Sequence, residues 1–188
     1  WVLGPRPQNL ERLKKDWLKW YEKRKKKPSF GSGAQRTARA IDRAVANRSS
    51  IILLAEGGGR RILLTGDAHG DDILAALKQA GLTDSQGRLH VDVLKVQHHG
   101  SLRNASPEFF QQLTADVYVI SANVHGHDGN PDLETLNWIV EAPRPNGRIR
   151  MVATNLTPGL KKIKRRIKKE KIPCELVVLA AGEHFISL

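Results

Sequence analysis

Two stretches of the sequence end an apolar run with side chains that can bind metal ions. The run over residues 60–65 is followed by Asp67, and the run over residues 91–96 is followed by His98 and His99. A carboxylate can bridge two cations, and imidazole nitrogens are ligands that suit zinc. Because rigid strands that end in ligands fix coordination geometry, this pattern predicts a metal site where the two strands end.

Small and polar residues accompany these candidates. Gly66 and Gly100 allow the backbone to turn sharply beside the ligands. His69, at the same strand end, either touches metal or substrate or lies in a surface loop. Ser101 and Asn104 either contact a substrate phosphate or shape the turn after the histidine pair. A later polar loop adds three more candidates for a supporting or substrate-binding role: Asn123, His125 and His127.

The spacing of apolar residues predicts the strands that position these side chains. A hairpin turn is expected at residues 56–59, because three consecutive glycines separate two apolar runs. The expected strands cover residues 1–3, 50–55, 60–65, 91–96, 117–120, 149–153, 176–180 and 184–186.

Helices are expected between the strands. Asn9 is a plausible N-cap for the first helix, residues 10–25. Its apolar residues fall near one face: Leu10, Leu13, Trp17 and either Trp20 or Tyr21. We interpret these aromatic residues as packing residues, with base stacking beside the lysines as the alternative. An exposed, flexible loop is expected over residues 25–36. The other expected helices cover residues 34–46, 71–80, 107–113 (with Ser106 as N-cap), 131–139 and 159–171.

Composition narrows the class of protein. At 188 residues with 40% hydrophobic content, the chain has the size of one domain, and its strand–helix alternation predicts an α/β fold. Its longest apolar stretches are strand-sized, so we expect no membrane association. The single cysteine, Cys174, is expected to be a packing residue and suits a cytoplasmic location.

The charge of the chain predicts a polyanionic partner. The net charge is +12, and the excess is concentrated in residues 11–27 and 161–171. Basic runs are usually solvated faces, but two of them in a small chain favour contact with DNA or RNA. The residues of the second run that we expect to contact nucleic acid are Lys162, Arg165, Arg166 and Lys169.

Four segments together resemble the metallo-β-lactamase fold superfamily, and most closely its branch in bacterial DNA-uptake (competence) proteins. The segments are Asn47 to Leu54, Leu64-Thr65-Gly66-Asp67, His98-His99-Gly100-Ser101, and Ser121-Ala122-Asn123 with Gly129-Asn130-Pro131-Asp132. The resemblance implies an αββα sandwich and two zinc or manganese ions. It also implies that Asp67 bridges the metals and orients the attacking hydroxide. His99 corresponds to the last metal histidine of the family, with His98 as its rival or its support.

The first metal motif of that family, His-x-His-x-Asp-His, has no counterpart here, since residues 1–46 contain no histidine. We therefore expect a carboxy-terminal half-domain. Residues 1–9 would form the strand entry, residues 10–46 a basic helical insertion with a flexible loop, and residues 47–188 the half-domain proper. The amino-terminal half would come from a partner polypeptide: a separate chain or a cleaved fragment. Loss of that half is the third possibility.

Three functions fit these observations. The first is a metal-dependent nuclease or phosphodiesterase, active only when the missing half completes its binuclear site, with Asp67 and His99 as catalytic residues and His98 as a further ligand. The second is a hydrolase of the same fold that acts on a small molecule. The third is a non-catalytic module that binds nucleic acid or protein. The basic charge favours phosphodiesters of nucleic acid.

Overall fold

The computed structural model describes residues 1–25, 43–122, 129–180 and 182. Three expected features lie outside these ranges. They are residues 26–36 of the loop expected over residues 25–36, the start of the helix expected over residues 34–46, and the strand expected at residues 184–186. No helix in the described ranges is both long enough and apolar enough to cross a membrane.

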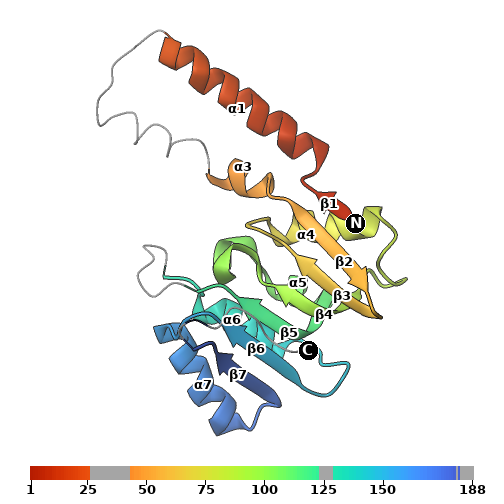
Figure 1. Ribbon diagram of the computed structural model, residues 1–188, viewed down its shortest axis with the longest axis vertical. Helices are drawn as coiled ribbons and strands as arrows, with labels where there is room; N and C mark the ends of the chain where they lie inside the picture. Colours follow the sequence, from red (N-terminus) through yellow and green to blue (C-terminus); the bar gives the residue numbers. More distant parts are fainter. Residues whose placement is uncertain (26–42, 123–128, 181, 183–188) are drawn as a thin grey trace.

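One seven-stranded sheet organises the chain, with its strands in sequence order (Figure 1). The first three strands pair antiparallel, and every later neighbour pairs parallel. The strands are β1 (Val2–Gly4), β2 (Ile52–Gly57), β3 (Arg60–Leu64), β4 (Leu89–Lys95), β5 (Leu113–Ile120), β6 (Ile149–Ala153) and β7 (Cys174–Val178). Parallel neighbours bring the carboxyl ends of β3 to β7 to one edge of the sheet, where ligands usually bind in α/β proteins.

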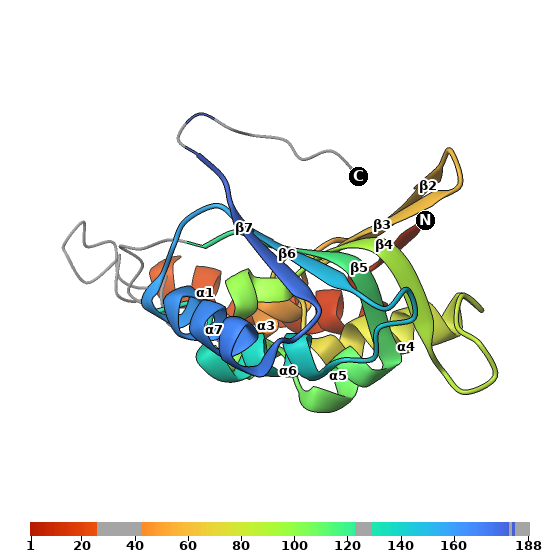
Figure 2. The same cartoon turned by 90° about the horizontal axis from the view of Figure 1, so that it is seen from below.

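The helices connect these strands. They are α1 (Pro7–Lys25), α3 (Arg43–Arg48), α4 (Gly70–Gln79), α5 (Pro107–Gln112), α6 (Leu133–Glu141) and α7 (Pro158–Glu170). Figure 2 shows α4 to α7 along one face of the sheet. They cover a large apolar core whose biggest fully buried side chains include Tyr118, Phe109 and Phe110. The chain is therefore an α/β protein, as its strand–helix alternation predicts.

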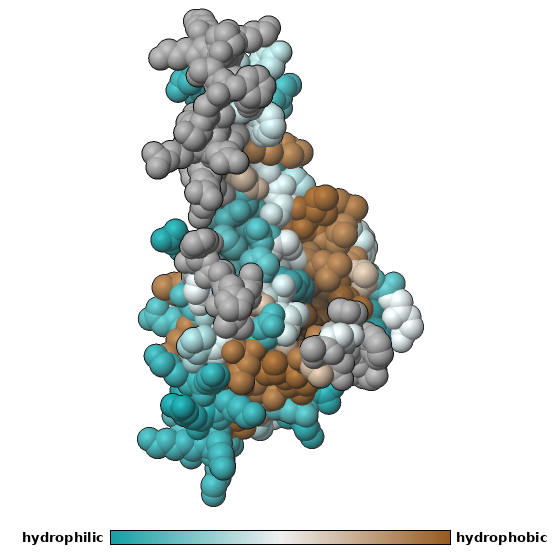
Figure 3. Space-filling view, turned by 60° about the vertical axis from the view of Figure 1, so that its left-hand side comes forward, coloured by the Kyte–Doolittle hydropathy of each residue, from teal (hydrophilic) through white to brown (hydrophobic). Residues whose placement is uncertain are grey.

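The other face of the sheet is also apolar. Val93, Val117 and Val152 form a second, smaller cluster there, with Ile62 and Val119 packed against it. At the β1–β3 side the apolar side chains are much more exposed, with Val2 at 78% and Leu64 at 43%. In the space-filling view hydrophobic surface is gathered into patches rather than scattered (Figure 3).

Most of the expected elements are confirmed, with shifted ends. The hairpin turn forms between β2 and β3, with Gly58 and Gly59 at positive φ. Ser106 caps α5, since its hydroxyl accepts a hydrogen bond from the amide of Phe109. β5 begins at Leu113, four residues before its expected start, and so takes the end of the predicted preceding helix. Burial raises the pKa of the Cys174 thiol to about 11, which fits an inert packing residue.

The expected N-cap at Asn9 is wrong. Helix α1 begins at Pro7, since proline suits a first helical turn, and Asn9 lies inside the helix. Its side chain is buried and donates to the carbonyl of Arg48, 3.0 Å away. The expected packing of the aromatic face is also incomplete. Trp17 and Tyr21 remain 53% exposed, although Trp17 makes an edge contact with Trp20.

Candidate metal site at the strand ends

The candidate ligands lie at the carboxyl ends of two neighbouring parallel strands, β3 and β4. Leu64, the last residue of β3, pairs with Lys95, the last residue of β4. Two hydrogen bonds link the segment after β3 to β4 and to the segment after it. The Thr65 hydroxyl donates to the Lys95 carbonyl at 2.6 Å, and the amide of His98 donates to the Gly66 carbonyl at 3.0 Å. The spacing along the sequence therefore becomes proximity in space, as predicted.

Asp67 and His99 face each other at this edge. The Nε2 atom of His99 lies 4.0 Å from Oδ1 of Asp67, and both side chains are accessible, 48% and 43% exposed. Gly66 sets the direction of Asp67, because its φ of 53° lies in the left-handed region and a Cβ there would meet Ser50 at 3.1 Å. The Ser50 hydroxyl accepts a hydrogen bond from the amide of Asp67.

The hydrogen bond of His99 fixes its tautomer. Its Nδ1 atom lies 2.7 Å from the carbonyl oxygen of Ser121. A carbonyl oxygen can only accept, so Nδ1 carries a proton, and in the neutral form of the ring Nε2 keeps its lone pair. That lone pair is on the nitrogen that faces Asp67, which is the arrangement a metal-ligating histidine needs.

His98 has a similar support from Asn104. Its Nδ1 atom lies 2.7 Å from Asn104 Oδ1, whereas the amide nitrogen of Asn104 donates to the Asp67 carbonyl at 2.9 Å. Because that amide nitrogen is used by Asp67, its oxygen must accept from His98 Nδ1. In the neutral ring, the Nε2 of His98 therefore also keeps its lone pair. The amide of Asn47 lies 3.2 Å from the same Nδ1, and the shorter contact to Asn104 decides the tautomer.

The backbone at the histidine pair is strained. His98 has φ 42° and His99 has φ 57°, both in the left-handed region that residues other than glycine rarely adopt. Gly100 follows with φ 83°, packed so closely that an added Cβ would meet Pro131 at 2.7 Å. The His98 carbonyl accepts from the Ser101 amide and from the Asn130 side chain. These contacts therefore stabilise a strained turn that sets the direction of both imidazole rings. Strained backbone of this kind is common at functional sites.

His69 lies at the start of α4, in the N-cap position, and its side chain makes no capping hydrogen bond. Burial is the main cause that lowers the pKa of His69 below its ordinary value, and the positive charge of Arg48 adds to this. A neutral imidazole can bind metal, and contact of His69 with metal or substrate stays a prediction.

Ser101 shapes the turn, which is one of its two predicted roles. It is 6% exposed, and its hydroxyl accepts from the amide of Arg103 to begin the 3₁₀ turn η2 (Leu102–Asn104). Asn104, 3% exposed, bridges His98 and Asp67 and therefore lies behind the site. The other candidates, Asn123, His125 and His127, lie outside the described residues.

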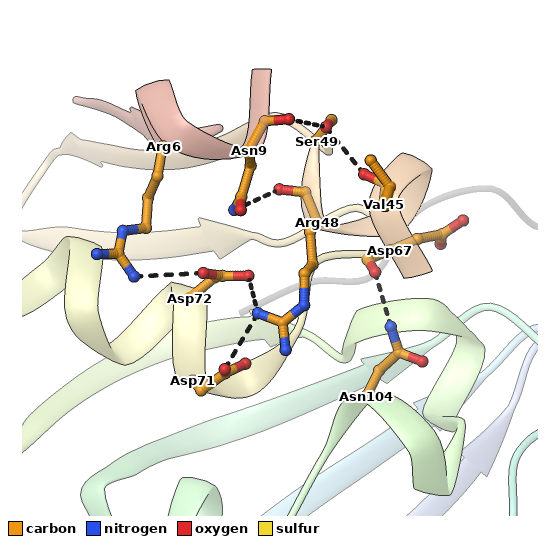
Figure 4. A network of polar contacts seen from close by, with 9 residues as sticks. All are labelled: Arg6, Asn9, Val45, Arg48, Ser49, Asp67, Asp71, Asp72 and Asn104. Carbon is orange, nitrogen blue, oxygen red and sulfur yellow. Dashed lines mark hydrogen bonds and ion pairs between the residues drawn. The ribbon is translucent and has the colours of Figure 1, made fainter. Parts of the chain in front are cut away.

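An ion-pair network joins Arg6, which directly precedes α1, and Arg48 of α3 to the first turn of α4 (Figure 4). Asp72, whose side chain is 5% exposed, accepts from Arg48 at 2.6 Å and from Arg6 at 3.4 Å. Arg48 also reaches Asp71 at 3.1 Å. Although burial opposes its charge, the hydrogen bonds and charges of the two aspartates raise the pKa of Arg48. The network holds the segment that carries Asn47 and the first turn of α4 in place.

The sequence did not single out Asn47 and Lys95 as site residues. Asn47 reaches His98 from a segment fifty residues away, and only the first quoted segment of the resemblance hinted at it. Lys95 lies on β4, and its ammonium group donates to the Val96 carbonyl at 2.8 Å. Burial lowers the pKa of Lys95, although the negative charge of Asp67 acts in the opposite direction. The sequence feature that could have identified Lys95 is a lysine at the end of an apolar strand.

The donor set supplies part of a metal site. Asp67 and the free Nε2 atoms of His98 and His99 have the chemistry that zinc and manganese bind. Within the described ranges, however, no three His, Cys, Asp or Glu side chains gather closely enough to hold a metal ion together. The described residues therefore offer an incomplete donor set for a metal ion.

The second candidate surface is helix α7. Thr157 caps it and Pro158 begins it, while Leu160 and Ile163 are fully buried. This orients Lys162, Arg165 and Lys169 outward, where all three are exposed. Arg166 differs from them because its guanidinium donates to Glu141 at 2.7 Å and to Glu170 at 3.0 Å. Of the four predicted contacts to nucleic acid, three are therefore open to a phosphate and one is held in ion pairs.

Comparison with known proteins gives one partial similarity. No family model matches the chain, and no solved structure matches it. ComE operon protein 3 of Bacillus subtilis (strain 168) is 34% identical over 100 residues, which is 53% of this chain and 12% of that protein. The chain is thus similar, over about half its length, to a small part of a much longer protein.

Proposed function

We propose that this chain forms part of a metal-dependent nuclease or phosphodiesterase with the αββα sandwich of the metallo-β-lactamase fold. In this proposal a separate segment that carries His-x-His-x-Asp-His completes a site for two zinc or manganese ions. The observation that carries the proposal is the pairing of Asp67 with His99 at the ends of β3 and β4, with Nε2 free toward the carboxylate.

The ligand count supports completion by another segment. An open zinc site normally uses three protein ligands and keeps one position for water or substrate. The described residues offer Asp67 and two imidazoles, and a site for two ions needs more. A bound pair of divalent ions would activate a water near neutral pH and stabilise the leaving oxygen. Asp67, and His99 through its Nε2 atom, would be the side chains of this chain that help to hold the ions.

The surrounding residues have supporting roles in this proposal. Asn104 holds the proton of His98 on Nδ1 and anchors the backbone of Asp67. His69, whose pKa is lowered by burial, would remain neutral at physiological pH and so could accept a proton or bind the second ion. The strained turn at His98 and His99 fixes the direction of both rings before any ligand binds.

The charge of the chain supports nucleic acid as the substrate. A net charge of +12 attracts polyanions, and the exposed side chains of Lys162, Arg165 and Lys169 offer contacts to phosphates. Partial similarity to ComE operon protein 3 agrees with the resemblance of the strand-end motifs to DNA-uptake proteins. Both considerations favour a phosphodiester over a small uncharged substrate.

The uncovered face of the sheet is evidence for a second β-layer in the assembled protein. Helices α4 to α7 cover one face, and the apolar side chains of the other face include Val2, Ile51 and Leu64, each more than 40% exposed. An apolar sheet face must be buried against another element to be stable in water. The αββα sandwich would bury it against the sheet of the segment that brings the remaining ligands.

Metal content and substrate choice test this proposal. The assembled protein, in which the chain is present with the completing segment, is analysed for zinc and manganese and assayed on DNA, RNA and a small-molecule lactone. We expect bound metal and chelator-sensitive cleavage of nucleic acid. Cleavage of the lactone alone would favour the small-molecule hydrolase, and salt-sensitive DNA binding without metal or cleavage would favour the binding module.

A further inference from the structure

One charged side chain interrupts an apolar row on the face of the sheet that α4 to α7 leave uncovered. Residues that pair across neighbouring strands project on the same side of a sheet. The pairing aligns one residue from each of the seven strands. The row is Val2, Leu53, Leu64, Lys95, Val119, Val152 and Val177. Lys95 is its central member and its only charged residue.

The β1–β3 end of the row is suited to contact with another apolar surface, whereas Val152 of the same row is buried. Val2 is 78% exposed and Leu64 is 43% exposed, and Ile51, which directly precedes β2, is 62% exposed. Exposed apolar side chains that adjoin one another in this way mark interaction sites. The β1–β3 side of the face is therefore where a partner would gain most from burial.

Lys95 sets a chemical condition on that partner. Its ammonium group has three donors, and one of them is used by the Val96 carbonyl at 2.8 Å. An apolar layer placed over the row would remove the remaining water from the ammonium group. Burying a charge in this way is costly unless an acceptor replaces the water. A partner that brings an acceptor to Lys95 is therefore favoured, in addition to the charge of Asp67 that already acts on the ammonium group, and a carboxylate is the strongest acceptor.

A second copy of this chain meets that condition poorly. In the neighbouring row of the same face, Glu175 already accepts from Arg150 at 2.9 Å, and Asp92 lies 3.3 Å from the guanidinium of Arg60. Two copies stacked on this face would bring the two central lysines near each other, and each chain carries a net charge of +12. The charges favour a different, carboxylate-bearing partner.

We propose that this face docks against an apolar β-layer of another polypeptide segment, and that this segment presents an aspartate or glutamate opposite Lys95. The inference rests on the proposed completion of the site, and it adds the side chain by which the completing segment is recognised. Lys95 then prevents pairing with the wrong surface as well as favouring the right one.

A charge-swapped copy of the chain serves as the test probe. Lys95→Glu carries the same apolar row with a carboxylate at its centre. Because position 95 is the middle of the row, the side chains at position 95 would face each other when two copies stack on this face. By sedimentation with EDTA present, we expect wild type and Lys95→Glu to be monomeric alone. An equal mixture should form a heterodimer with at least tenfold tighter affinity than either self-association. Lys162→Glu, which makes the same charge change on α7, should not associate with wild type.

Three outcomes would overturn the inference. If the mixture associates no more tightly than wild type or Lys95→Glu does alone, then Lys95 does not determine which surface docks on this face. A wild-type dimer that is abolished by Leu64→Asp would make a second copy the occupant. Lys95→Met supplies an independent check, since removal of the charge should increase self-association, and no increase would contradict the argument. Thermal melts establish that each variant is folded. Because no metal takes part, these results are separate from the test of hydrolysis.

Discussion

The Nε2 atom of His99 lies 4.0 Å from Oδ1 of Asp67, and the proton of His99 is held on its other nitrogen by the Ser121 carbonyl. Two groups that can both donate lone pairs therefore face each other without a hydrogen bond between them. An ion of the kind proposed above would use both lone pairs. The strained backbone of His98 and His99 is also typical of a functional site.

Asn104 should control the tautomer of His98. In Asn104→Leu the ring loses its acceptor, and the Asp67 carbonyl loses its donor. We expect the Nδ1–H form of His98 to lose its dominance, and metal affinity of the assembled protein to fall by about 10–100-fold. Long-range proton–nitrogen NMR of the histidine rings measures the tautomer directly.

Asn146→Leu is the matched control, because Asn146 bonds Asp116 and lies near His90 at the opposite ends of the strands. It should leave the His98 signals unchanged. If Asn104→Leu also leaves them unchanged, Asn104 does not position the ring.

The four basic residues of α7 should separate into two groups. Lys162→Glu, Arg165→Glu and Lys169→Glu remove exposed cations, and each should lower the slope of log affinity for DNA against log salt by about one if it contacts a phosphate. Arg166→Glu breaks ion pairs with Glu141 and Glu170. Arg166→Glu should therefore lower the thermal stability more than it changes the salt slope. Fluorescence anisotropy across a salt series, beside thermal melts, distinguishes the groups, and four equal slopes would refute the division.

Gly100 should tolerate a side chain much less well than Gly147. Both have positive φ, so alanine adds backbone strain of about 1–3 kcal/mol at either position. At Gly100 the new Cβ would also meet Pro131 at 2.7 Å, whereas nothing lies within 4 Å of it at Gly147. Overpacking of this kind costs a further ~1–3 kcal/mol. Urea unfolding of the two variants measures the difference, and equal losses would mean that the turn after His99 adapts easily.

The isolated 188-residue chain should bind metal weakly, because its described residues supply one side of a site. Metal analysis after dialysis against zinc or manganese should give much less than one ion per chain. Near-stoichiometric binding of two ions by the folded chain would contradict the proposed completion by another segment.

The sequence predicted the features that depend on local patterns. Apolar runs that stop at Asp67 and at His98 located both strand ends, and α7 was evident from the spacing of Leu160, Ile163 and Ile167. These features were predictable because hydrophobic periodicity and strand-end turns are encoded within about ten residues.

Features that depend on distant partners were not predictable. Asn9 looked like a helix cap, and only its contact with the Arg48 carbonyl, thirty-nine residues away, shows why it is buried within the helix. Arg166 looked equivalent to its neighbours until Glu141 was placed beside it. The position of Lys95 in an apolar row depends on the register of the strands, which no single segment specifies.

Asp67→Ala in the assembled protein tests the central claim most directly. The measurement is hydrolysis of single- and double-stranded DNA with added zinc or manganese, beside a thermal melt, with Asp116→Ala as the control carboxylate at the other end of the sheet. We expect the rate to fall by about a hundredfold or more while the melt is preserved, because the proposed metal ions would lose an anionic ligand. His99→Ala should cause a similar loss and His69→Ala a smaller one. A folded Asp67→Ala protein that cleaves DNA at the wild-type rate would contradict the metal site.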